Sequence, residues 1–214
     1  MGGRGMSVLP ATVSPGYVEH WTNGLGQNIT TLKAALGDKG KPMSMKAAFS
    51  GANPHFSDDF SEYSENCQRC VVAYELRRRG YDVTALPTYK GDVLPNGTAK
   101  GNGRWMGAFQ NAKNVLVGAK TQKSAKANIE SQMKKWGDGS RAIVRVGWKG
   151  TNYGHVFNVE NRKGRMYFVD AQIGQRVNIN EYLSQARTDT IRLVRTDNLR
   201  ISDRAKKSVT TQKF

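Results

Sequence analysis

The stretch that decides the fold is Asn66-Cys67-Gln68-Arg69-Cys70-Val71-Val72-Ala73-Tyr74-Glu75-Leu76-Arg77-Arg78-Arg79-Gly80. Asparagine is a favoured helix N-cap and glycine a common helix stop, so the pattern predicts a helix from about Cys67 to Arg79. Residues three and four apart share one face of a helix, which places Cys67, Cys70 and Tyr74 together. We expect this face to pack on a β-sheet, with Cys67 at its open end.

A cysteine in the first turn of a helix is suited to nucleophilic chemistry. The unpaired N–H groups and the positive dipole end at a helix start favour a thiolate over a thiol. Cys67 adjoins the cap, whereas Cys70 lies within the helix beside Val71 and is typical of a small buried apolar residue. We therefore expect Cys67 to be the nucleophile, with Cys70 as the alternative.

The second half of the chain has strand-like alternation of apolar and polar residues. Ala142 to Trp148, Gly154 to Glu160 and Arg165 to Ala171 each predict a β-strand. Asn161-Arg162-Lys163-Gly164 lies between the last two segments and is a turn-forming cluster. The last two segments therefore predict a β-hairpin.

The register of this hairpin decides which side chains meet. A loop centred on the Arg162-Lys163 bond pairs Phe157 with Phe168 and His155 with Asp170. Opposed residues have Cβ atoms about 4.5–5.5 Å apart, close enough for a carboxylate to orient an imidazole. A bulged loop would shift the register by one residue. A cysteine at a helix start, with a histidine and an aspartate on neighbouring strands, is the arrangement of a thiol nucleophile with its base and orienting acid.

Cys-x-x-Cys is also typical of redox disulfides and of zinc sites. The lead-in to the motif is polar and no strand precedes it, unlike a thioredoxin-type motif. The chain has only two cysteines and three histidines, with no second ligand pair at metal-binding spacing. The sequence therefore favours the nucleophile interpretation, and we expect no metal and no other cofactor.

Four blocks of residues resemble one known family. They are the Asn-Cys-x-x-Cys-Val-Val-Ala block from Asn66, residues 78–87, residues 154–159, and residues 167–174. In this order they are similar to the papain fold toxin family, whose members are described as glutamine deamidases and occur as toxin domains and within phage head-associated proteins. The resemblance spans roughly residues 56–196. It implies an α+β, papain-like fold in which the nucleophile helix packs on an antiparallel β-sheet.

The resemblance also implies roles for particular residues. Cys67 would be the nucleophile, His155 the base and Asp170 the orienting acid of a protein glutamine deamidase, and the partner would be a protein with an exposed glutamine. Asn66 and Gln172 are candidates for completing an oxyanion hole. The same triad would serve a cysteine protease or a transamidase, because each begins with thiolate attack on an amide.

The chain has 214 residues, which is enough for one domain with a full core. We expect a loosely ordered segment over residues 1–55, rich in Gly, Ser, Pro and Asn. A papain-like catalytic domain is expected over residues 56–196. A basic tail that frays is expected over residues 197–214.

The formal net charge is +16, which favours encounters with acidic partners. An acidic inhibitor or immunity protein, a nucleic acid and a phage capsid are the partner classes that this charge suggests. A basic virion or nucleic-acid-associated protein that uses the fold as a scaffold is the non-enzymatic alternative. No long apolar run and no signal peptide are visible, so we expect no membrane span and a cytoplasmic protein of the producer or target cell, or a virion-associated one.

Overall fold

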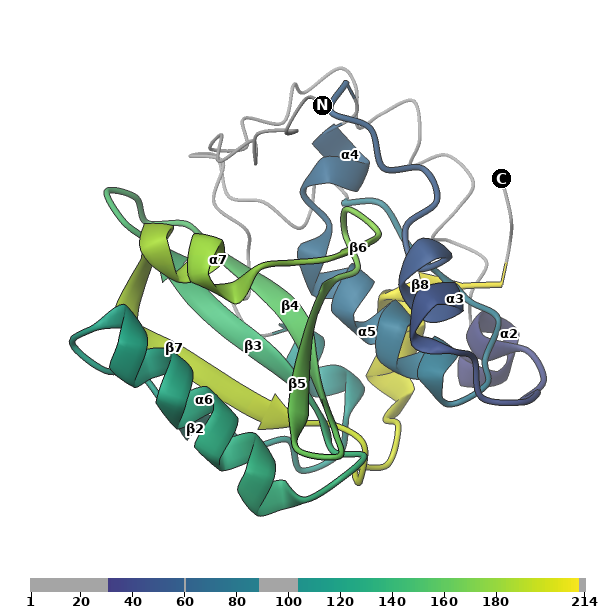
Figure 1. Cartoon of the computed structure of the whole chain (residues 1–214). Helices are drawn as coiled ribbons and strands as arrows, with labels where there is room; N and C mark the ends of the chain where they lie inside the picture. The colour runs from purple at the N-terminus through teal and green to yellow at the C-terminus, as the bar shows by residue number, and fades with distance from the viewer. Residues whose placement is uncertain (1–30, 60, 89–103, 212–214) are drawn as a thin grey trace.

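A computed structural model describes residues 31–59, 61–88 and 104–211 of the chain. Its helices and strands pack around a six-stranded sheet (Figure 1). The helices are α2 (Leu32–Leu36), α3 (Met45–Ser50), α4 (Ser61–Ser64), α5 (Cys67–Arg78), η2 (Arg104–Ala108), α6 (Gln122–Trp136), α7 (Ile179–Gln185) and η3 (Asp203–Lys207). The strands are β1 (Thr84–Ala85), β2 (Val115–Leu116), β3 (Arg141–Trp148), β4 (Gly154–Arg162), β5 (Arg165–Asp170), β6 (Gln175–Arg176), β7 (Ala186–Arg195) and β8 (Val209–Thr210).

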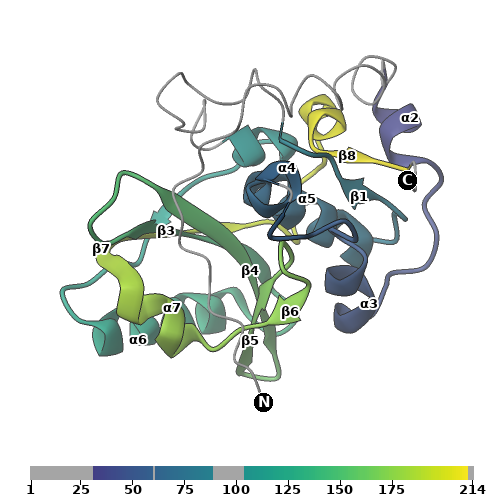
Figure 2. The same cartoon turned by 90° about the horizontal axis from the view of Figure 1, so that it is seen from above.

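The main sheet is antiparallel at every described pairing and has the order β2-β7-β3-β4-β5-β6. Helix α5 lies on one side of it, and α6 and α7 lie on the other (Figure 2). Strand β3 shows why both faces are covered. Ile143 packs into the cluster around α5, whereas Val144 and Val146 pack into the cluster around α6 and α7. Because successive side chains of a strand point to opposite faces, one apolar strand contributes to two cores.

The nucleophile helix forms as the sequence predicts and ends one residue earlier than expected. Helix α5 spans Cys67–Arg78, with Arg79 as its C-cap residue. Val71, Val72 and Tyr74 are fully or almost fully buried, and the side-chain amide of Asn158 in β4 donates to the Val71 carbonyl at 3.3 Å. The expected α+β architecture, with this helix packed on an antiparallel sheet, is therefore confirmed.

Two segments expected to be loosely ordered are folded. Within residues 31–55, helices α2 and α3 bury Leu36, Met45 and Ala48 against the α5 side of the core. At the other end of the chain, β8 pairs with β1 and buries Val209. Residues 31–55 and 197–211 are folded because each stretch, although polar overall, carries a few apolar side chains that pack into the core. Residues 1–30 and 212–214 lie outside the described part.

The predicted hairpin exists, but its register is shifted by two residues. The turn consists of Lys163 and Gly164, both with positive φ (51° and 79°), as a two-residue type I′ connection requires. The strands therefore continue to Arg162 and Arg165, which pair with each other. The expected opposition of Phe157 to Phe168 and of His155 to Asp170 is wrong. Because the shift is even, His155 and Asp170 still project from the same face as diagonal neighbours.

Candidate active site

The residues Cys67, His155 and Asp170 meet where three elements end. Cys67 is the first residue of α5, His155 the second of β4 and Asp170 the last of β5. Element ends are suitable places for reactive groups, because the side chains there are held by the fold without being covered by a following turn. Cys67 is partly exposed, whereas Asp170 is only 3% exposed.

His155 lies between Asp170 and Cys67. Its Nε2 lies 2.6 Å from Asp170 Oδ2, and Cys67 on its other side is close enough to help raise the pKa of the imidazole. Since Nε2 is engaged by the carboxylate, Nδ1 is the nitrogen left for the sulfur. The sequence anticipated this group of three residues, although it placed His155 directly opposite Asp170 and the structure places them diagonally.

The residue before His155 is Gly154, which lets the backbone of β4 approach that of β3 closely. A Cβ atom at Gly154 would lie 2.4 Å from the Val146 carbonyl oxygen of the neighbouring strand β3. Only glycine lets β4 approach β3 this closely. Gly154 therefore fixes the start of β4, and with it the position of His155.

Asp170 is held by two further donors that the sequence did not reveal. The Tyr182 hydroxyl in α7 donates to Asp170 Oδ2 at 2.7 Å, and the Gln172 backbone N–H donates to Oδ1 at 3.0 Å. Tyr182 is itself buried, with 3% of its surface exposed. These bonds fix the carboxylate that in turn orients His155.

Aromatic rings enclose the imidazole. The Trp148 indole is stacked on His155 at 5.9 Å with an interplanar angle of 18°, and the rings of Phe157 and Tyr182 lie about as close, at 6.1 and 6.0 Å. A stacked ring limits the rotation of the imidazole. The face of an aromatic ring also attracts a cation, so the stacking favours the protonated imidazole. Sequence alternation alone marked Trp148 only as a strand residue, because the contact depends on the pairing of β3 with β4.

The electrostatics of the three residues favour charge separation. Burial lowers the pKa of His155, but the charge and hydrogen bond of Asp170 and the contact with Cys67 outweigh it and raise that pKa to about 10. Burial works to raise the pKa of Asp170, yet His155 and the donors Tyr182 and Gln172 hold it below its ordinary value. At neutral pH the imidazole is therefore cationic and the carboxylate anionic.

Cys70 occupies a different environment from Cys67. It is fully buried, and its thiol donates to Asn66 Oδ1 at 3.0 Å. Burial and the neighbouring Cys67 and Asp170 raise the pKa of Cys70 well above its ordinary value. A buried neutral thiol of this kind is inert. The geometry thus separates the two cysteines, which are both free thiols.

The Asn66 side chain forms structural hydrogen bonds instead of capping α5 or completing an oxyanion hole. It occupies the N-cap position of α5, but its side chain forms no capping bond. Its amide donates to Asn53 Oδ1 at 3.0 Å and to the Leu86 carbonyl at 3.1 Å. An amide has only two N–H groups, so none is left for an oxyanion. The assignment of the Asn66 side chain to an oxyanion hole therefore fails.

Asn53 extends this buried hydrogen-bond network and joins the segment before α5 to the turn after Asp170. Its side-chain amide donates to the Tyr63 carbonyl at 2.8 Å and to the Gln172 carbonyl at 2.9 Å. The Gln172 side chain donates to the Ser64 carbonyl. The turn after Asp170 is thus tied to the residues that lead into α5. Strand β5 ends at Asp170, so Gln172 lies in this turn and not on a continued strand.

Two glutamates precede the nucleophile. Both carboxylate oxygens of Glu62 and Oε2 of Glu65 are buried without a hydrogen-bond partner in the described part of the chain. Burial raises the pKa of Glu62, and burial together with the charge of Glu62 raises the pKa of Glu65 to about 7. Both groups therefore favour the protonated form more than exposed glutamates do.

The described residues contain neither a metal-binding cluster nor a membrane-spanning helix. Across residues 31–59, 61–88 and 104–211, no group of three or more His, Cys, Asp and Glu side chains could hold a metal ion. Within the same ranges, no helix has both the length and the apolar character needed to cross a bilayer.

The family model described as papain fold toxin 1, glutamine deamidase, matches residues 65–175, which is just over half of the chain. No curated protein matches. The matched range contains all three residues that meet at the site, and its fold agrees with the helix-on-sheet architecture. The chain belongs to the papain fold toxin 1 family of glutamine deamidases.

Proposed function

We propose that this protein is a protein glutamine deamidase that acts through Cys67, His155 and Asp170. The observation that supports the proposal is the grouping of Cys67, His155 and Asp170, with His155 Nε2 2.6 Å from Asp170 Oδ2 and the pKa of His155 raised by Asp170 and Cys67. A cationic imidazole beside a cysteine at a helix start stabilises a thiolate, which is the reactive form of the nucleophile. The family match supports hydrolysis of a carboxamide over other uses of the same triad.

In the first half of the reaction, the Cys67 thiolate attacks the carboxamide carbon of a substrate glutamine. The negative charge moves to the carboxamide oxygen of the tetrahedral intermediate. The backbone N–H groups of Cys67 and Gln68 form no hydrogen bond within the described residues, whereas those of Arg69 and Cys70 bond to the Asn66 carbonyl. We assign the first two as oxyanion donors, since the Asn66 side chain does not cap them.

In the second half, protons move through His155. The imidazolium gives its proton to the departing nitrogen, so that ammonia leaves and a thioester to Cys67 remains. The neutral imidazole then takes a proton from a water molecule, which attacks the thioester and releases glutamate and the thiolate. Asp170, held by Tyr182, keeps the imidazole in one orientation throughout.

The test is the mass of a glutaminyl peptide after incubation with the wild-type protein and with C67A. A deamidase converts the amide to an acid without breaking the chain, and oxygen-18 from labelled water enters the product. We expect this conversion with the wild type and not with C67A. Chain cleavage would indicate a cysteine protease, and incorporation of an added amine would indicate a transamidase. No change in any peptide would leave the scaffold interpretation as the better one.

A further inference from the structure

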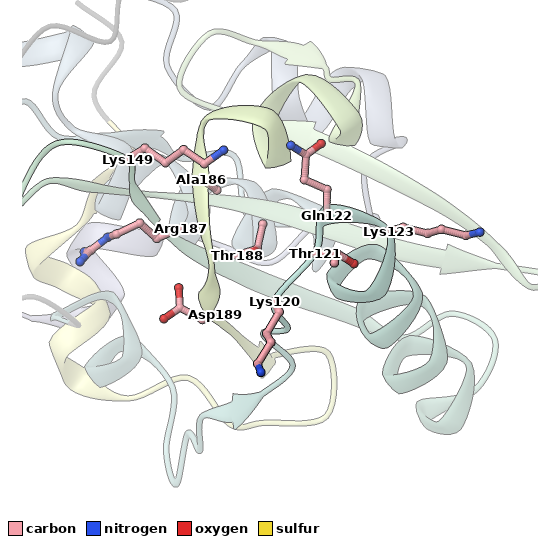
Figure 3. Close-up of a pocket in the computed structure, with 9 residues that line it drawn as sticks. All are labelled: Lys120, Thr121, Gln122, Lys123, Lys149, Ala186, Arg187, Thr188 and Asp189. Carbon is pink, nitrogen blue, oxygen red and sulfur yellow. The ribbon is translucent and has the colours of Figure 1, made fainter.

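A hollow lined mainly by polar and basic residues lies at the end of strand β3 and the start of β7, and the proposed chemistry does not use it. It has a volume of about 680 Å³ and lies between the start of α6 and the start of β7 (Figure 3). We call it the basic pocket, and it is lined by Lys120, Thr121, Gln122, Lys123, Lys149, Ala186, Arg187, Thr188 and Asp189.

The basic pocket is connected to the active site through strand β3 and helix α7. Lys149 directly follows Trp148, whose indole stacks on His155. Ala186 in the pocket wall pairs with Trp148 across the β3–β7 ladder. The Lys149 ammonium and backbone N–H donate to the carbonyls of Ser184 and Gln185, at the end of the helix that supplies Tyr182. A ligand in the pocket would therefore lie beside the elements that hold His155 and Asp170.

Four cationic side chains surround the pocket and one carboxylate offsets them. Lys120, Lys123, Lys149 and Arg187 are all exposed, and within the described ranges none of them is within ion-pair distance of a carboxylate. Many arginines elsewhere in the fold are paired with carboxylates, namely Arg77, Arg78, Arg79, Arg141, Arg162 and Arg195. The cations of the pocket differ from these arginines because no described carboxylate neutralises them.

The backbone has two close approaches at this pocket. A Cβ atom at Gly118 would lie 2.3 Å from the Asp189 carbonyl oxygen, so only glycine lets the segment before α6 approach β7. A Cβ atom at Gly147 would lie 2.7 Å from the Arg187 guanidinium, so glycine lets that side chain lie across β3. These close approaches bring the segment before α6 and strand β3 directly against β7.

We propose that the basic pocket receives an acidic segment of the protein substrate that flanks the target glutamine. The proposal rests on the deamidase function proposed above. Opposite charge favours both the encounter and the register of the complex. A short run of Asp or Glu fits better than a nucleic acid, because the pocket is lined by no aromatic side chain on which a base could stack.

The experiment compares glutaminyl peptides that carry a block of glutamates with peptides that carry serines in its place. The block is set before or after the glutamine at increasing spacings, and kcat/KM is measured by ammonia release. The pocket variant is K120Q/K123Q. Its matched control is K134Q/K135Q, which removes two exposed lysines from the far end of the same helix. The lysines are chosen because substituting Arg187 would also disturb its packing on Gly147.

We expect the wild type to prefer an acidic peptide, and we expect the preference to fall about fivefold in K120Q/K123Q, since exposed ion pairs are individually weak. High salt should reduce the preference of the wild type in the same way, because surface charges are screened. K134Q/K135Q should keep the wild-type preference. Equal turnover of acidic and neutral peptides, or an equal loss in both variants, would overturn the proposal.

The outcomes separate this proposal from the proposed function. If no peptide is deamidated, the deamidase function fails, and binding of the acidic peptide to C67A still tests the pocket by fluorescence anisotropy. Loss of that binding in C67A/K120Q/K123Q, and not in C67A/K134Q/K135Q, would support the pocket. A single-stranded oligonucleotide that binds through Lys120 and Lys123, with no preference among peptides, would assign the pocket to nucleic acid and contradict the proposal.

Discussion

Substitution of Tyr182 by phenylalanine tests how Asp170 is controlled. The change removes one hydroxyl and retains the ring, which packs 5.0 Å from Phe157 and 6.0 Å from Trp148. The lost bond is the 2.7 Å contact from the Tyr182 hydroxyl to Asp170 Oδ2. A hydrogen bond to a charged group is worth about 1.5–3 kcal/mol. Because this bond stabilises the carboxylate and helps to hold the pKa of Asp170 down, that pKa should rise in Y182F.

The sign of the effect follows from the lowered pKa of Asp170 in the fold. A carboxyl group with a lowered pKa stabilises the fold above its unfolded-state pKa, and this contribution is lost as the pH falls through the folded-state value. In Y182F the loss should begin at a higher pH. The acid limb of kcat/KM for ammonia release should therefore shift upward, and acid unfolding should also occur at a higher pH.

A second buried tyrosine supplies the matched control. Tyr74 donates to Glu160 Oε1 at 2.5 Å and is fully buried, but its carboxylate partner belongs to an ion-pair network with Arg78 and Arg162. Y74F should cost a similar amount of stability in urea unfolding and leave the acid limb of kcat/KM in place. An acid limb that does not move in Y182F, or that moves equally in Y74F, would refute the positioning role of Tyr182.

Three further predictions concern Gly154, Glu65 and Cys70. G154A should cost about 1–3 kcal/mol of stability and most of the activity, because its methyl group would meet the Val146 carbonyl; unchanged urea unfolding would contradict this. The raised pKa of Glu65 stabilises the fold below about pH 4.5, and this contribution is lost as the pH rises through about 7. E65Q should therefore have a higher melting temperature than the wild type at pH 8 but not at pH 4. The reverse order in thermal melts would refute the assignment. C70A should keep the ammonia release that C67A abolishes, and its free energy of unfolding in urea should be lower by about 1 kcal/mol. Loss of activity in C70A would instead identify Cys70 as the nucleophile.

The sequence predicted the parts of the fold that depend on local patterns. Helix α5 has a cap, a stop and apolar spacing within 15 residues, and strands β3 to β5 have clear alternation, so both were located almost to the residue. The hairpin register failed because the turn cluster spans four residues, and only the positive φ angles of Lys163 and Gly164 select the last two.

The contacts that the sequence missed are made between distant segments. Tyr182, Asn53 and Trp148 reach the site from α7, from the segment after α3, and from β3. Each looks ordinary in its own segment, and nothing local marks it as a partner of Asp170, Gln172 or His155. The polar segments at the two ends of the described chain were missed for the same reason, because their few apolar residues become significant only when the core receives them.

The most direct test of the central claim is the rate of iodoacetamide labelling at each cysteine, resolved by peptide mass spectrometry at neutral pH. The claim is that Cys67 is an activated nucleophile paired with His155, and that Cys70 is a buried structural thiol. We predict fast labelling at Cys67 that is strongly reduced in H155A, with Cys70 unlabelled until the protein unfolds. Slow and equal labelling of the two cysteines, or labelling of Cys67 that is unaffected by H155A, would contradict the account.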